Sequence, residues 1–399
     1  MKKRPLEGIR VVDFTHVLSG PVAGSMLADL GAEVIKVEKV SGGDSTRQMG
    51  PPFQQDQTAF FQSVNRGKRG LAVSLKDPRG LAAVKKLIES ADVLLENFRP
   101  GVMKKLGLGY ENVKAMNPAI IYASMTAYGY EGPYKDYPGY ELIVQALTGM
   151  VDLQSGADGT PRKAQPQLVD LGTGVIMSVG VLAALFHRQC TGQGQWVKGN
   201  LLHSAAMLMC NFYSKYGIDG SMPPRGLDTR SDFITPSQAY KTADGYFVTV
   251  TPGRQWARFC TALNRPEWAD DPDYSNAAWR KNNVNRLEEE IQAITTKQTT
   301  GYWLIRFKEC DVPIARVNTL GEFMDQDPQA KALGIFREVS HPELGLVRGL
   351  VSPPWEFSET PCDTITPPPM LGEHSNEILQ GLGYPPEEIL ALREAKVIA

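Results

Sequence analysis

The feature that most constrains the fold is the alternation of short apolar runs with helical patterns over the first 125 residues. Residues 9–14, 33–38, 92–96 and 120–124 are runs of five or six residues rich in Val, Ile and Leu. Helical patterns at 21–30 and 78–90 separate some of these runs. Short apolar strands that alternate with helices are typical of βαβ units and a parallel sheet. We therefore expect an α/β fold with a large Rossmann-like domain.

The pattern changes after this region. Helical segments are expected at 139–150, 170–189 and 202–216, and a Gly- and Pro-rich linker follows at 217–236. Residues 237–241 and 246–250 are predicted to form a hairpin across a Thr-Ala-Asp-Gly turn, followed by helices at 255–263, 285–294 and 300–309. The chain then reads as irregular from 311, with two short helices at 375–382 and 386–395.

Charge and cysteine usage exclude several classes of protein. Lys plus Arg is 42 and Asp plus Glu is 44, a net charge of −2, so no nucleic-acid partner is expected. We expect no membrane-spanning helix, since no apolar run reaches about 18 residues. The N-terminus has no apolar signal-peptide core, so a cytoplasmic protein is expected. The five cysteines form no C-x-x-C and the five histidines no H-E-x-x-H, so no metal site is expected.

Two residues stand out from the sequence itself. The fingerprints G-x-G-x-x-G and G-x-x-x-x-G-K-[ST] are absent, so the sheet does not imply NAD or ATP. His16 follows the first strand, where open α/β sheets bind ligands, although a loop histidine bonded to backbone fits equally. Asp170 begins an apolar helix, where Asp is also a common capping residue. Gly172 and Gly174 would let another segment or a ligand approach that helix closely.

Basic residues gather after the predicted strands. They are either a solvated face or a group that meets phosphates at the carboxyl end of the sheet. The loop 41–47 is expected to be flexible, and Asn97–Gly101 fits a ligand-facing loop. The basic positions are Lys39, Lys76, Lys104, Lys105 and the run Asn65–Arg69.

Taken in order, several segments resemble class III CoA-transferases. Each is weak alone, but the ordered set covers nearly the whole chain: 5–14, 20–21, 27–38, 65–69, 92–101, 191–195, 243–246 and 371–374. The resemblance implies a large Rossmann-like CoA-binding domain at 1–216, a linker at 217–236 and a smaller α+β domain at 237–310. A second linker at 311–330 and a segment at 331–399 that returns to the large domain complete the plan. It also implies ring-shaped subunits that interlock as a homodimer.

The same resemblance implies a set of site residues. Asp170 matches the family's nucleophile, within Leu168–Leu171. Coenzyme A and acyl-CoA are then substrates, with no tightly bound cofactor. The implied CoA contacts are His16, Val17, Leu18, Ser19, Lys39, Val73, Ser74, Leu75, Lys76, Asn97, Phe98, Arg99, Lys105, Tyr140 and Glu141.

Three departures argue against oxalate as a substrate. Formyl-CoA transferases carry Gln where Leu18 stands and Trp where Met49 stands. They also carry a run of glycines where residues 225–232 contain only Gly226. A second carboxylate could instead be clamped by arginines, which makes a dicarboxylate such as succinate a reasonable donor. The arginines considered are Arg47, Arg66, Arg69 and Arg230.

An aspartate nucleophile suits the transfer of CoA between acids. Its carboxylate can attack a thioester to give a mixed anhydride, and CoA thiolate can then form an aspartyl-CoA thioester. With an ordinary pKa of about 3.9, the carboxylate is expected to be ionised unless burial raises that pKa strongly. Glu141 is a candidate to position groups beside Asp170.

Three alternative functions fit the sequence less well. An α-methylacyl-CoA racemase needs two acid/base groups, and racemases carry His where this chain has Tyr140, whose pKa near 10 makes it a poor base. A non-catalytic CoA-binding subunit would be signalled by loss of Asp170, which is present. A nicotinamide-dependent dehydrogenase is disfavoured by the missing glycine fingerprint.

Overall fold

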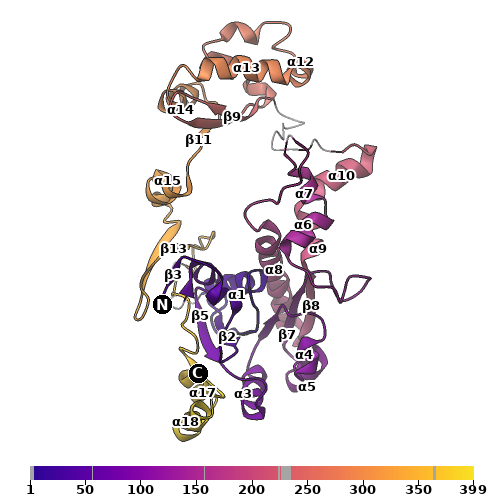
Figure 1. Ribbon diagram of the computed structural model, residues 1–399, viewed down its shortest axis with the longest axis vertical. Coiled ribbons are helices and arrows are strands. Elements are labelled where there is room, and N and C mark those ends of the chain that lie inside the picture. The colour runs from indigo at the N-terminus through magenta and orange to yellow at the C-terminus, as the bar shows by residue number, and fades with distance from the viewer. Residues whose placement is uncertain (1–3, 56, 157, 223–224, 226–234, 363–364) are drawn as a thin grey trace. The chain divides into compact units, whose positions relative to one another are not determined.

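The computed structural model (Figure 1) describes residues 4–55, 57–156, 158–222, 225, 235–362 and 365–399. The chain forms two compact units. The first contains Met1–Gln154, Pro161–Met222 and Gln329–Ala399, and the second contains Ser155–Thr160 and Pro223–Pro328. Most of the first linker, 226–234, lies outside the described residues. The domain boundaries expected from the sequence stay a prediction.

The first unit is built on a six-stranded sheet in which every strand pair is parallel. The strand order is β5-β2-β1-β6-β7-β8. Numbered along the chain, this is the order 3-2-1-4-5-6 of dinucleotide-binding folds. The predicted parallel sheet is confirmed. Its strands are β1 (Arg10–Asp13), β2 (Glu33–Glu38), β5 (Lys68–Ala72), β6 (Val93–Glu96), β7 (Ile121–Thr126) and β8 (Gln195–Asn200).

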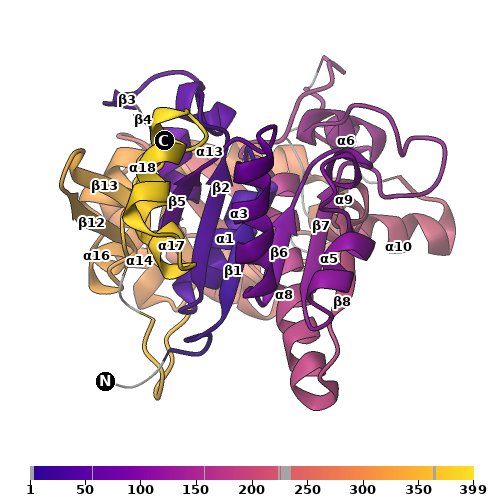
Figure 2. The same cartoon turned by 90° about the horizontal axis from the view of Figure 1, so that it is seen from below.

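Helices cover both faces of this sheet. α1 (Ser19–Asp29) and α8 (Leu168–Thr191) pack on one face, against Val11, Val34 and Val93. α3 (Pro78–Glu89), α5 (Tyr110–Met116), α17 (Ser375–Gly381) and α18 (Pro386–Glu394) pack on the other, against Val12 and Leu94. Figure 2 looks onto this second face. Neighbouring strand residues such as Val11 and Val12 enter opposite cores, which is why these strands read as continuous apolar runs.

The contact between α1 and α8 depends on a glycine. A Cβ atom added at Gly174 would lie 2.6 Å from the Ser19 carbonyl oxygen and 2.7 Å from the Val22 Cβ. The expectation that this glycine allows close approach is confirmed, with α1 as the approaching segment.

In the described part of the chain, α8 is the one helix long and apolar enough to cross a membrane. One face of α8 packs against α1 and the sheet, and 44% of its most apolar window is buried.

The second unit contains a three-stranded antiparallel sheet in the order β11-β10-β9. The predicted hairpin is confirmed as β9 (Ser237–Lys241) and β10 (Tyr246–Val250), and β11 (Ile314–Arg316) lies within the expected second linker. Phe247, Phe259 and Trp303 are among the side chains of its core. Its helices are α11 (Trp256–Ala262), α12 (Ala277–Asn282), α13 (Val284–Thr295), α14 (Thr300–Glu309) and α15 (Leu320–Asp325).

Several elements differ from the sequence expectation. The helix expected over 139–150 is two helices separated by Gly149, whose φ of +76° favours glycine. The region expected to be irregular after 311 contains a β-hairpin, β12 (Phe336–His341) and β13 (Gly345–Val351). The remaining elements are β3 (Phe53–Gln54), β4 (Gln57–Thr58), α2 (Ala59–Val64), α4 (Val102–Lys105), α6 (Glu141–Leu147), α7 (Met150–Leu153), α9 (Leu201–Leu208), α10 (Cys210–Asp219) and α16 (Pro328–Ala332).

The close contact at Gly174 gives a test of the packing. Gly174→Ala should lower the free energy of unfolding by about 1–3 kcal/mol, because the new methyl group would overlap the α1 backbone. Gly217→Ala in α10 is the matched control, since a Cβ there meets nothing within 4 Å. That change should raise stability by roughly 0.5–1 kcal/mol. Urea unfolding followed by circular dichroism measures both, and equal effects would contradict the packing.

Candidate active site

The site lies where the strand order reverses, between β1 and β6. Loops leaving the carboxyl ends of two such strands turn away from each other and leave a crevice. Two hydrogen bonds tie the loops together: the His16 N–H donates to Asn97 Oδ1 (2.8 Å), and Asn97 Nδ2 donates to the His16 carbonyl (2.7 Å). The His16 and Phe98 rings lie 5.2 Å apart. Two residues predicted from separate motifs therefore fix each other.

A cavity of about 260 Å³ opens at this point. It is lined by the loops after β1, β6 and β7 and by the starts of α6, α8 and α9. The structure thus brings together most of the residues that the sequence singled out. They are His16, Val17, Leu18, Ser19, Asn97, Phe98, Arg99, Tyr140, Glu141 and Asp170.

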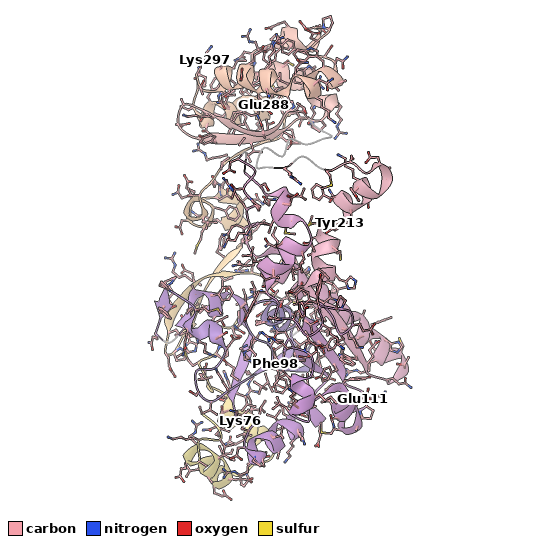
Figure 3. All side chains as sticks on the ribbon, turned by 45° about the vertical axis from the view of Figure 1, so that its right-hand side comes forward. Lys76, Phe98, Glu111, Tyr213, Glu288 and Lys297 are labelled. Carbon is pink, nitrogen blue, oxygen red and sulfur yellow. The ribbon has the colours of Figure 1, made fainter. Side chains whose placement is uncertain are left out.

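The other six predicted CoA contacts do not line this cavity. They follow β2, β5 and β6, so they lie toward the same edge of the sheet. Figure 3 labels Phe98, which lines the cavity, and Lys76, which does not. Lys39, Lys76 and Lys105 are exposed, Ser74 and Leu75 are half-buried, and Val73 is buried against the C-terminal Ile398. Their contact with CoA stays a prediction.

Asp170 lies in the first turn of α8, but it does not cap that helix. α8 has no side-chain cap at its N-cap residue, Gln167. The Glu141 carboxylate instead accepts hydrogen bonds from the N–H groups of Val169 (3.2 Å) and Asp170 (3.0 Å). Gln145 Nε2 donates to the same carboxylate at 2.6 Å. Because Glu141 satisfies these N–H groups, the Asp170 side chain is not needed for capping and faces the cavity.

The surroundings of Asp170 change its acid–base chemistry. Burial, and then the neighbouring Glu141, raise its pKa from 3.8 to about 7, against the opposing effect of a hydrogen bond with the Ser19 hydroxyl. The carboxyl group is therefore only partly ionised at neutral pH, which is the exception expected from the sequence for a strong effect of burial. A carboxylate whose pKa is raised in this way is more basic than an exposed one. The negative charge of a carboxylate disappears when it is acylated.

The histidine in the cavity is disfavoured as a cation. Burial, followed by the nearby Lys36 ammonium, lowers the pKa of His16. Its Nδ1 lies 3.9 Å from Asp44 Oδ2, beyond hydrogen-bond distance. A neutral imidazole can accept or donate one hydrogen bond toward a ligand in the cavity.

Sequence reasoning missed five residues of the cavity wall. Met125, Thr126 and Ala127 lie at the carboxyl end of β7, so the rule that singled out His16 would have found them. Leu201 follows β8, a strand that was not predicted. Gly139 also lines the cavity. A Cβ there would lie 2.4 Å from the Ala127 Cβ, so a larger residue would not fit at this position.

The arginines expected to clamp a second carboxylate are engaged within the chain. Arg47 forms two hydrogen bonds with Glu38, at 2.9 and 2.7 Å. Arg66 pairs with Asp29 at 2.5 Å, and Arg69 pairs with Glu33 at 2.6 Å and Glu377 at 2.8 Å. The clamp expectation is wrong for these three, and Arg230 lies outside the described residues, as do residues 226–232 of the stretch compared with the glycine run. Within the cavity, Arg99 is the arginine, and no carboxylate of the described chain pairs with it.

The loop 41–47 also differs from expectation. Asp44, Thr46 and Arg47 are buried, so the C-terminal half of this loop is locked in place instead of flexible.

Among the described residues, no group of three or more His, Cys, Asp or Glu side chains is placed to hold a metal ion.

Comparison with known proteins gives one consistent result. Residues 6–375 match the model of CoA-transferase family III. The chain is 37% identical over 378 residues to succinyl-CoA:glutarate CoA-transferase of Mus musculus, covering 94% of this chain and 86% of the mouse protein. It is 37% identical over 388 residues to succinate–glutarate CoA-transferase of Agrobacterium fabrum, covering 96% of each. A CAIB/BAIF family protein from Brucella suis superimposes with a TM-score of 0.85 at 32% identity, covering 96% of this chain and 100% of that one.

The raised pKa of Asp170 predicts an unusual effect on stability. A carboxyl group whose pKa is higher in the folded state stabilises the fold below about pH 4, and this contribution is lost as the pH rises through about 7. Asp170→Asn should therefore be more stable than the unchanged protein at pH 8, by roughly 1–4 kcal/mol, with no difference below pH 4.

Glu387→Gln is the matched control for this measurement. Glu387 is an exposed acidic residue in the first turn of α18. Its replacement should lower stability slightly, by about 0.3–1 kcal/mol, through the helix dipole. Denaturant unfolding at both pH values measures the two variants. A loss of stability at pH 8 in Asp170→Asn would show that the carboxylate is a structural element of α8 after all.

Proposed function

Since the chain belongs to CoA-transferase family III, we propose that it moves CoA from an acyl-CoA to a dicarboxylic acid, with Asp170 as the nucleophile. The observation that carries this proposal is the Asp170 carboxyl group itself. It lines the cavity at the strand-order reversal together with Ser19, and Glu141 accepts the hydrogen bonds of the N–H groups that a capping side chain would otherwise bind. A half-buried carboxyl group in a cavity, with its pKa raised to about 7, marks a candidate functional site.

The first half of the reaction forms two covalent species in turn. The Asp170 carboxylate attacks the carbonyl carbon of the donor thioester, the C–S bond breaks, and CoA leaves as the thiolate. The product is a mixed anhydride between Asp170 and the donor acid. The thiolate then attacks the Asp170 carbonyl carbon, the donor acid leaves as its carboxylate, and an aspartyl-CoA thioester remains.

The second half reverses these steps with the acceptor. The acceptor carboxylate attacks the aspartyl-CoA thioester and releases the thiolate, which gives a second anhydride. The thiolate attacks the acceptor-derived carbonyl carbon, forms the new acyl-CoA and frees the Asp170 carboxylate. No proton is consumed over the cycle. The Ser19 hydroxyl lowers the pKa of Asp170 and the neighbouring Glu141 raises it, so both groups adjust the reactivity of the carboxylate.

Two observations support dicarboxylic acids as substrates. The relatives from Mus musculus and Agrobacterium fabrum are named for succinyl-CoA or succinate and for glutarate, which are dicarboxylic. In the cavity, Arg99 has no carboxylate partner from the described chain, so it can bind an anionic group of either substrate.

The exposed Lys39, Lys76 and Lys105 supply positive charge for the CoA phosphates toward the same sheet edge. The relatives described above are transferases, so neither a racemase nor a non-catalytic subunit gains support.

The proposal includes a homodimer with interlocked subunits. Part of the first unit exposes many large apolar side chains from α6, α8, α9 and α10. They include Leu142 (48% exposed), Val179 (61%), Phe186 (69%) and Met207 (62%). Apolar exposure on several neighbouring helices is typical of a face that another protein covers. A second copy of this chain is the proposed occupant.

An interlocked dimer should not dissociate on dilution. Two closed subunits can separate only when one of them opens, so dissociation would follow unfolding kinetics instead of interface affinity. Analytical ultracentrifugation from micromolar to nanomolar concentration should show dimers throughout. Reversible appearance of monomers at nanomolar concentration would rule out the interlocked arrangement.

Acyl-CoA alone should load Asp170 when no acceptor acid is present. Hydroxylamine should then convert the activated carboxyl into a hydroxamate on the peptide that contains Asp170, as read by mass spectrometry. Asp170→Ala should abolish both labelling and transfer while CoA binding is nearly unchanged, because this side chain serves chemistry more than affinity.

A control separates Asp170 from other acidic residues of its own unit. Asp152 lies in α7, near the cavity helices but outside the cavity lining. Asp152→Ala should keep both labelling and transfer. Near-normal turnover by folded Asp170→Ala would contradict the nucleophile assignment and the covalent mechanism together.

A further inference from the structure

The turn that carries Ser19 to Asp170 contains a strained residue. Val17 has a φ of +68°, the left-handed region that β-branched residues strongly disfavour. Such a conformation persists only where the surroundings impose it, and it is found preferentially at functional sites. Ser19, two residues later, lines the same cavity as Asp170, and its hydroxyl counteracts the rise in the pKa of that carboxyl group. The geometry of Val17 therefore decides where the Ser19 hydroxyl lies.

A buried acidic residue from the loop after β2 holds this turn. Asp44 Oδ1 accepts hydrogen bonds from the N–H groups of Val17 (3.4 Å) and Thr46 (3.0 Å). Asp44 Oδ2 pairs with the Lys36 ammonium at 3.0 Å, and both side chains are fully buried. Lys36 Nζ also donates to the Thr15 carbonyl at 2.9 Å. One carboxylate–ammonium pair thus contacts the backbone on both sides of His16.

Asp44 is itself fixed from behind. Its backbone N–H donates to Glu38 Oε1 at 2.8 Å, and Glu38 is held by the bidentate Arg47. Gly43 permits this approach, because a Cβ there would lie 2.6 Å from Glu38 Oε1. Burial opposes ionisation of Asp44, but the Lys36 charge keeps its pKa well below the ordinary value. The pair is therefore charged in the folded protein and cannot shift without breaking several buried bonds.

We propose that Asp44 is a positioning residue for CoA transfer, which through Lys36 and the Val17 N–H holds the strained turn that sets Ser19 against Asp170. The inference rests on the proposed function, since it assumes that Asp170 is the nucleophile. Asp44 does not line the cavity, so its effect on the reaction passes through the turn. The loop 41–47, which was expected from the sequence to be flexible, serves instead to shape the active site.

The test compares two substitutions that each remove one charge from a buried ion pair. Asp44→Asn keeps an acceptor for the Val17 N–H but turns an amide toward Lys36. Asp29→Asn is the matched control, because Asp29 pairs with Arg66 at the opposite end of α1 from the turn. The measured quantity is the single-turnover rate at which succinyl-CoA acylates Asp170, trapped as the hydroxamate and expressed per folded protein.

Asp44→Asn should slow acylation by about tenfold to a hundredfold, as expected when a reacting group is misplaced. Asp29→Asn should leave the rate within about twofold of that of the unchanged enzyme, even if its melting temperature falls by as much as that of Asp44→Asn. A purely structural role for Asp44 would lower stability without changing the rate per folded molecule. Equal rates in the two variants would overturn the inference.

Val17→Gly provides a second and independent readout. Glycine adopts a φ of +68° without strain, so the turn should depend less on Asp44 in that background. Measured against Val17→Gly, the double variant with Asp44→Asn should lose no more than about threefold, because the strain that required holding is gone. This comparison also decides the matter if Asp44→Asn alone does not fold.

The outcomes separate this inference from the function on which it rests. The inference is overturned if Asp44→Asn slows acylation equally in both backgrounds. Absence of any hydroxamate in the unchanged enzyme would overturn the proposed nucleophile, and the positioning role with it. Normal labelling in the unchanged enzyme, with Asp44→Asn acylated as fast as Asp29→Asn, would overturn the positioning role alone.

Discussion

The reversal of strand order between β1 and β6 is the constraint on which the site depends. The chain leaves β1 toward β2 through α1, and it leaves β6 toward β7 through α5, on the opposite face of the sheet. Right-handed connections in opposite directions across a parallel sheet require this arrangement. The two loops therefore separate and leave a crevice, which the reciprocal hydrogen bonds of His16 and Asn97 keep at a fixed width. Asp170 reaches the crevice from α8, whose Gly174 lets it lie directly against α1.

Residues that build this crevice also make the ionised form of Asp170 unfavourable in the folded protein. Glu141 satisfies the free N–H groups at the start of α8, and by doing so it places a second carboxylate beside Asp170. Burial and this neighbour disfavour the ionised form of Asp170, which raises its pKa to about 7. In the proposed reaction, acylation of Asp170 removes that charge, so the unfavourable burial of the ionised carboxylate is relieved when the anhydride forms. Functional sites commonly depart from the most stable choice in this way.

Local patterns predicted the elements whose residues agree with their surroundings. The strands predicted at 33–38 and 120–124 are rich in apolar and β-branched residues, as their burial requires, and the hairpin at 237–250 is marked by its Thr-Ala-Asp-Gly turn. β5 was missed because it begins with Lys68 and Arg69, which read as a solvated basic run. Their charges are neutralised by Asp13 and Glu33, from strands more than 30 residues earlier in the chain. β8 was missed because it is an edge strand with polar residues and little burial.

The sequence by itself determined the family, the parallel sheet, the two loops at its carboxyl edge and the choice of Asp170, because these depend on local order along the chain. Only the tertiary structure decided what the charged residues do. Arg47 was expected to bind a substrate carboxylate and Asp44 to lie in a flexible loop, but they are buried partners of Glu38 and Lys36. The pKa of Asp170 likewise depends on Glu141, 29 residues away, and on burial. Burial and pairing arise from segments distant in the sequence, and the energy of a charge depends on both, so its role is set by the fold and not by its neighbours in the chain.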